Sequence, residues 1–183
     1  MRIVCAVVTA VLISGCITME PELTINIEFG PFTEPEAEHH QAMMQMVLDL
    51  YNEVPATFTI AAGDYYMTDP AGLRVPEGAT LNLGDARFIW SKNINEDGQT
   101  FLVEDASNVS IFGGVIIGAR DSWDAGVNVA GIRALGQSHN LRIERTVCEN
   151  LSSNAFGVFG ASDEDPIRNV SLIDVVAKNC CNY

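Results

Sequence analysis

Two polar segments of the chain contain residues that could bind a ligand. In the first, Asp121 and Asp124 flank Trp123 within a loop that begins at Arg120. An exposed tryptophan beside carboxylates offers a surface on which a sugar ring can stack, and such loops often carry binding residues. Asp121, Trp123 and Asp124 are therefore candidate substrate-binding residues. Burial of Trp123 in the core is an equally good interpretation.

The second segment is the acidic run Asp163-Glu164-Asp165. Its carboxylates are the type of oxygen ligand that a hard cation such as Ca²⁺ prefers. Consecutive side chains point in different directions, however, so a solvated loop that ends at Pro166 is the alternative. We take Asp163 and Asp165 as candidate calcium ligands, and no other cofactor is evident.

The first sixteen residues have the pattern of an export signal. Arg2 precedes an apolar run from Ile3 to Ile13, which at ~1.5 Å per residue is too short to cross a hydrocarbon core of ~30 Å. The stretch Ile13-Ser14-Gly15-Cys16 resembles a bacterial lipobox. We expect a signal peptide at residues 1–15, lipidation of Cys16, and a segment at 16–32 that anchors the protein to the cell envelope and ends in a short strand at Leu23–Ile27. Cleavage nearby, with Cys16 incidental, would instead give a secreted protein.

Composition narrows the classes of partner. The chain has 183 residues, of which 48% are hydrophobic, and this is enough for one domain with a core. Its formal charge of −14 argues against nucleic acid, because binding to phosphate backbones needs a basic surface. Neutral or cationic ligands suit it better. After export, Cys148, Cys180 and Cys181 remain, and we expect buried thiols rather than a disulfide framework.

The elements that position these residues begin with one helix, predicted over about 34–53. Thr33 and Glu36 have the spacing of a capping box, and Pro55 ends the helical pattern. Apolar residues recur between them at helical spacing. Those expected to cover the end of a core are Met43, Met44, Val47 and Leu48.

Short β-rich runs follow Pro55, separated by Gly, Pro, Asn and Asp, with no second helix evident. The predicted strands are Thr57–Ala61, Tyr65–Thr68, Ala79–Leu83, Arg87–Trp90, Phe101–Val103, Val109–Phe112, Val115–Ile117, Ile132–Leu135 and Phe156–Phe159. An all-β fold is therefore expected.

An internal repeat is the strongest pattern. Residues 108–118, 140–150 and 169–179 align with apolar residues at matching positions. A strand-and-turn unit of this size cannot bury its apolar face alone, so stacked units are predicted to form a solenoid. In this alignment Arg145 stacks on Asp174 and Glu149 on Lys178, while the amides of Asn150 and Asn179 form an internal ladder.

With these repeats, the segments 57–66, 73–83 and 108–118 resemble the first coils of the pectin-lyase-like superfamily. The resemblance covers residues 33–183 and implies a right-handed parallel β-helix with an amino-terminal capping helix. It also implies a lyase or glycosidase that binds or cleaves extracellular polysaccharide. No polar or helical cap is apparent near Tyr183, so we expect the chain to be the truncated amino-terminal part of such a domain, with an open end that aggregates or needs a capping protein partner.

The chain departs from the family where hydrolytic members carry carboxylates. The corresponding stretches are Asn154-Ala155-Phe156 and Asn179-Cys180-Cys181, which contain no acid. Catalytic residues are therefore unknown and would lie beyond residue 183 if the protein is an enzyme. The alternative is a non-catalytic β-helix module for surface adhesion or scaffold assembly.

Overall fold

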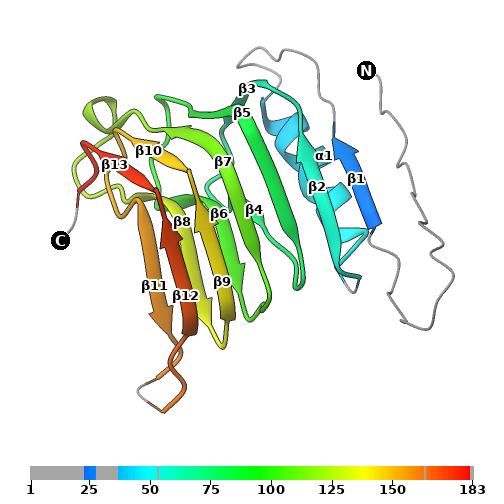
Figure 1. The fold of residues 1–183 in the computed structure, drawn as a ribbon. Coiled ribbons are helices and arrows are strands. Elements are labelled where there is room, and N and C mark those ends of the chain that lie inside the picture. The colour runs from blue at the N-terminus through cyan, green and yellow to red at the C-terminus, as the bar shows by residue number, and fades with distance from the viewer. Residues whose placement is uncertain (1–22, 28–36, 53, 163, 182–183) are drawn as a thin grey trace, which may run out of the picture.

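The computed structural model describes residues 23–27, 37–52, 54–162 and 164–181. Within them the chain is mainly β, with one α-helix, α1 (Ala37–Asp49), and one 3₁₀ turn, η2 (Arg120–Ser122). The strands form two sheets in which every pairing is parallel (Figure 1). Among these residues no helix has the length and apolar character needed to span a bilayer.

The larger sheet, sheet A, has nine strands and the smaller, sheet B, has four. Sheet A contains β1 (Leu23–Ile27), β2 (Ala56–Ile60), β3 (Gly63–Met67), β5 (Thr80–Trp90), β7 (Ser110–Ile117), β9 (His139–Glu144), β10 (Val147–Glu149), β12 (Arg168–Ile173) and β13 (Val176–Lys178). Sheet B contains β4 (Leu73–Arg74), β6 (Gly98–Glu104), β8 (Val129–Gly136) and β11 (Phe156–Gly160). The chain passes repeatedly from one sheet to the other, which is consistent with a parallel β-helix.

Sheet A changes direction part-way along its strands, at residues with positive φ. Gly84 and Gly113 have φ of 51° and 72°, and both lie inside continuous strands, β5 and β7. Each of these strands therefore joins two that were predicted separately. β5 joins those at 79–83 and 87–90, and β7 joins those at 109–112 and 115–117. In later coils Arg145 and Asp174 occupy this conformation, with φ of 54° and 51°, and there the strands do break. Glycine tolerates this backbone without the steric cost that a Cβ brings.

The predicted alignment of the repeats is confirmed residue by residue. Ser110 pairs with Arg142, Leu141 with Val170, and Glu149 with Lys178. The ammonium group of Lys178 contacts the carboxylate of Glu149 at 2.8 Å, as expected. The Arg145 guanidinium, predicted to stack on Asp174, instead pairs with Glu144 on its own coil.

Asparagine ladders stabilise the turns. The Asn179 amide donates to Asn150 at 3.2 Å, so this predicted ladder is confirmed, although it is exposed rather than internal. A second ladder links Asn108, Asn140 and Asn169 through hydrogen bonds of 2.9 and 2.8 Å. All five residues have positive φ, a conformation that asparagine tolerates better than most side chains.

The core consists of columns of inward-facing side chains, one from each coil. One column contains Phe58, Leu81, Ile111, Ile143 and Leu172. The first four are at most 5% exposed, whereas Leu172 is 46% exposed. Val158, at the end of a column in sheet B, is 41% exposed. The core is thus closed at its amino-terminal end and open at the last described coil.

Helix α1 closes the amino-terminal end, next to β3 and β4 (Figure 1). Its described range begins at Ala37, because residues 34–36 of the predicted helix lie outside the described residues. Met44 and Leu48 are buried, and Val47 packs on the same core. The predicted covering role is confirmed for these three residues, while Met43 is only half-buried.

Candidate functional site

The loop proposed from sequence as a sugar platform has a different geometry. Trp123 is 8% exposed, and its indole N–H donates to the carbonyl of Ser91 at 2.9 Å. The expectation of an exposed ring was therefore wrong, and the core interpretation holds. Asp121 and Asp124 are exposed, and a binding role for this loop stays a prediction that now rests on its carboxylates.

The other candidate residues are only partly described. Asp165 is exposed and accepts a hydrogen bond from the Gln137 amide, whereas Asp163 and the lipidation candidate Cys16 lie outside the described residues. Within the described ranges, no group of three or more His, Cys, Asp or Glu side chains could hold a metal ion. The calcium and lipid sites therefore stay predictions.

The structure contains a groove that the sequence did not reveal. It lies between helix α1 and the adjoining edge of sheet B and has a volume of about 720 Å³. The helix contributes Gln45, Met46 and Asp49, and sheet B contributes Arg74 and Leu102. We call this hollow the helix groove.

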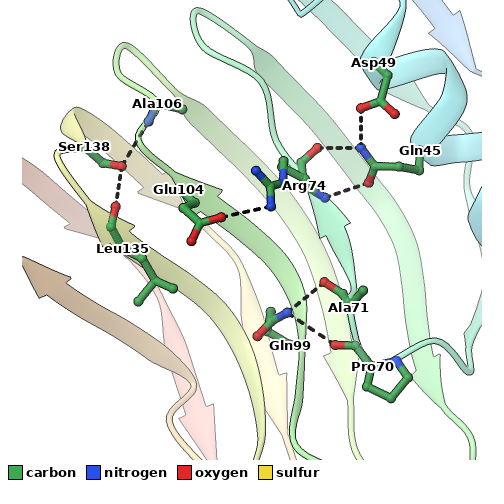
Figure 2. Close-up of polar contacts among 10 residues, drawn as sticks. All are labelled: Gln45, Asp49, Pro70, Ala71, Arg74, Gln99, Glu104, Ala106, Leu135 and Ser138. Atoms are coloured by element: carbon green, nitrogen blue, oxygen red, sulfur yellow. Dashed lines mark hydrogen bonds and ion pairs between the residues drawn. The ribbon is translucent and has the colours of Figure 1, made fainter. Parts of the chain in front are cut away.

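A glutamine on α1 closes the free edge of sheet B. Strand β4 is the last strand of that sheet, so its outer backbone groups face no further strand. The Gln45 side chain accepts from the Arg74 N–H at 2.7 Å and donates to the Arg74 carbonyl at 3.2 Å (Figure 2). It also donates to Asp49 at 2.7 Å. This amide takes the place of a neighbouring backbone and protects the edge from pairing with another chain.

One helical turn earlier, Gln41 makes equivalent contacts with the loop before β4. Gln41 is 3% exposed, and its side-chain oxygen accepts from the backbone N–H groups of Thr68 and Asp69, each at 3.1 Å. Its amide nitrogen donates to the Asp69 carbonyl at 2.8 Å. The floor and the helical wall of the groove are therefore fixed relative to each other.

From the helix groove a row of outward-facing residues continues along sheet B. Arg74, Leu102 and Arg133 occupy matching positions on β4, β6 and β8. The Arg74 guanidinium forms an ion pair with Glu104 at 2.9 Å (Figure 2). These residues and the next aligned row form one surface, which we call the sheet B track. It consists of Arg74, Leu102, Arg133, Glu104, Leu135 and Phe159.

The track ends at an exposed aromatic ring. Glu104, Leu135 and Phe159 are aligned on β6, β8 and β11, and Phe159 is 47% exposed. Gln99, which lines the helix groove, links it to the track. Its side chain accepts from Arg133 at 3.2 Å and donates to the Ala71 carbonyl at 2.7 Å. Polar and apolar side chains thus lie next to each other along the axis of the coils, at intervals set by a strand spacing of about 4.8 Å.

Each acidic group of this surface has a described partner. Asp49 accepts from Gln45, Asp69 accepts from the Ala71 N–H at 2.9 Å, and Glu104 is paired with Arg74. These contacts orient the carboxylates and leave oxygen atoms that can accept hydrogen bonds from hydroxyl groups.

Sheet A carries a second charged cluster on its outer face. Glu144, 9% exposed, accepts two hydrogen bonds from Arg142, at 3.1 and 2.6 Å, and also pairs with Arg145. The hydrogen bond from Arg142 is the main cause that lowers the pKa of Glu144, with further contributions from the charges of both arginines outweighing burial. Arg142 also lies over the Phe112 ring, 5.7 Å from its centre. This carboxylate holds the arginines in place and is poorly suited to act as an acid.

Of the three cysteines expected to be buried, Cys148 is buried, whereas Cys180 and Cys181 are only half-buried. Cys148 is fully buried, and burial raises the pKa of its thiol. Burial also raises the pKa of Cys180. The three described cysteines are free thiols.

Comparisons with known proteins bear on the fold. No protein-family model matches the chain, and no curated protein matches it. Among solved structures, it is similar to a protein of Parabacteroides merdae described as a candidate glycosyl hydrolase, with a TM-score of 0.52 and 12% sequence identity. The alignment covers 78% of this chain and 88% of that chain. At this identity the similarity shows a shared parallel-sheet fold alone.

Proposed function

We propose that this protein is a right-handed parallel β-helix of the pectin-lyase-like type that binds polysaccharide along the sheet B track. The continuous surface from the helix groove to Phe159 is the observation that carries this proposal. It offers a repeating array matched to a repeating ligand, with Leu102, Leu135 and Phe159 available to sugar faces and polar groups available to hydroxyls. The similarity to a candidate glycosyl hydrolase supports this ligand class.

Binding without cleavage is the form of this function that the geometry favours. The described carboxylates of the groove and track all have partners, and the aligned stretches at Asn154 and Asn179 contain no acid. We therefore place the protein among surface adhesion or scaffold modules. Catalysis of the lyase or glycosidase type would require residues outside this surface.

The proposed location follows from the first residues of the chain. Export through the signal at 1–15 and lipidation of Cys16 would attach the protein to the cell envelope. The sheet B track would then be presented to extracellular polysaccharide.

Affinity electrophoresis of the full chain in detergent tests the proposal. Gels would contain neutral polysaccharides (xylan, mannan, β-glucan) or acidic ones (polygalacturonate, alginate), and release of reducing ends or unsaturated products would be followed in parallel. We expect at least one polysaccharide to retard the protein without being cleaved. Retardation should weaken several-fold in Phe159→Ala and stay unchanged in Phe112→Ala, which removes an aromatic ring from sheet A instead. Retardation by none of the polysaccharides, or a loss confined to Phe112→Ala, would overturn the proposal.

A further inference from the structure

We infer that the sheet B track selects neutral polysaccharide and rejects acidic polysaccharide. This inference rests on the proposed function and concerns the charge of the sugar units. It follows from how the charged residues of the helix groove and the track are paired.

Both arginines of this surface have partners. Arg74 is neutralised by Glu104 at 2.9 Å, whereas Arg133 donates one hydrogen bond to the neutral Gln99 side chain at 3.2 Å and keeps its charge. A uronate carboxylate could reach Arg74 only by displacing Glu104, which would leave that carboxylate facing the ligand unpaired. Such an exchange gains little, because one ion pair replaces another and a repulsion is added.

The remaining charges repel anions. Asp49 and Asp69 line the helix groove, each with one carboxylate oxygen engaged by a described hydrogen bond, to Gln45 and Ala71 respectively. Together with Glu104 they make three acids against two arginines, on a chain with a formal charge of −14. A field of this sign lowers the local concentration of anionic polymers.

The same groups suit an uncharged sugar. A carboxylate oxygen accepts hydrogen bonds from hydroxyl groups, and these charge-assisted bonds are stronger than neutral ones. Met46 and Leu50 on the helix are 57% and 72% exposed, and they add apolar area beside Leu102. Carboxylate acceptors beside apolar patches match the alternating hydroxyls and C–H faces of a neutral glycan.

The test uses the same electrophoresis with the two ligand classes separated and the salt concentration varied. We expect retardation by a neutral polysaccharide that is insensitive to salt, and none by polygalacturonate or alginate. The Asp49→Asn, Glu104→Gln double variant should bind the neutral polysaccharide roughly tenfold more weakly, because the hydrogen bonds from sugar hydroxyls lose the assistance of the carboxylate charge. The double variant Asp85→Asn, Glu149→Gln makes the same change in charge on sheet A, where Glu149 also has an ion pair, and it should bind normally.

Each outcome separates this inference from the proposed function. Salt-sensitive retardation by the acidic polysaccharides would overturn the inference while leaving polysaccharide binding intact. Equal weakening in both double variants would also overturn it, since net charge rather than the groove would then decide affinity. Retardation by neither class would overturn the proposed function itself.

Discussion

At the scale of single residues, the turns and ion pairs show how far the sequence determines local geometry. The repeat placed Glu149 over Lys178 and Asn150 over Asn179, and both pairs are in contact. Arg145 was placed over Asp174 but pairs with Glu144, because a long side chain can reach several acids and alignment alone does not choose between them. Trp123 was ambiguous for a related reason: its indole needs a partner for its N–H in either setting, and here the Ser91 carbonyl provides one inside the core.

Asn140 separates the effect of backbone conformation from that of the amide ladder. Its φ is 55°, and its side chain bonds to both Asn108 and Asn169. We expect Asn140→Ala to lower the free energy of unfolding by roughly 1–2 kcal/mol through left-handed strain alone. Asn140→Gly loses the same ladder bonds without that strain, so it should cost less. Denaturant unfolding of the two variants measures the difference, and equal costs would show that φ is not the controlling factor.

Glu144 predicts a defined pH dependence. Because its pKa is lowered in the folded protein, its ion pairs contribute stability above the ordinary glutamate pKa of about 4.3. This contribution is lost as pH falls through the lowered folded value. Glu144→Gln should therefore be less stable than the wild type at neutral pH, with the gap closing in acid. Thermal unfolding across this pH range checks the expectation, and a gap independent of pH would contradict it.

At the scale of elements, strands were easier to predict than the contacts between helix and sheet. Alternation in the sequence located the strands, because inward and outward residues differ in polarity. It did not show that β5 and β7 continue through Gly84 and Gly113, since glycine also marks turns. The helix groove was not predicted either, because the partner of Gln45 is a strand edge 29 residues away. Gln41 and Gln45 lie one turn apart in line with Asp49, so the sequence pattern alone assigned them to the polar face of the helix.

Gln41 is expected to be essential for docking of α1. Its buried amide makes three hydrogen bonds to the loop before β4. Gln41→Ala would remove the side-chain partner of two part-buried backbone N–H groups, those of Thr68 and Asp69, at a total cost of about 1–3 kcal/mol. Denaturant unfolding should show a clear loss of stability, with little change in the control Met46→Ala, whose side chain is exposed on the same helix. Similar stability of the two variants would show that α1 is held by its apolar residues alone.

At the scale of the whole molecule, the two ends of the coil stack differ. The amino-terminal end is covered by α1 (Figure 1), whereas the last described coil leaves Leu172 and Val158 about half exposed at the ends of apolar columns. The repeat predicted such columns because aligned apolar positions must stack. A capping protein partner at this end remains a proposal, and exposed strand edges favour association with other strands.

When the 183-residue chain is produced by itself, we expect the exposed apolar residues of this coil to favour self-association. Leu172→Lys places a charge on the exposed column. At each protein concentration, its sedimentation velocity profile should therefore show more monomer than that of the wild type. Ser171→Lys places the same charge on the neighbouring residue of β12, whose side chain belongs to the outer face, and should leave association unchanged. A wild-type protein that stays monomeric at all concentrations would contradict this prediction.

The central claim is that polysaccharide binds along the sheet B track. A crystal structure of the protein with an oligosaccharide derived from the retained polysaccharide tests it most directly. We expect a sugar chain that runs from the helix groove, past Arg74 and Leu102, toward Phe159. Sugar bound on the outer face of sheet A, beside Arg142 and Phe112, with the sheet B track empty, would contradict it.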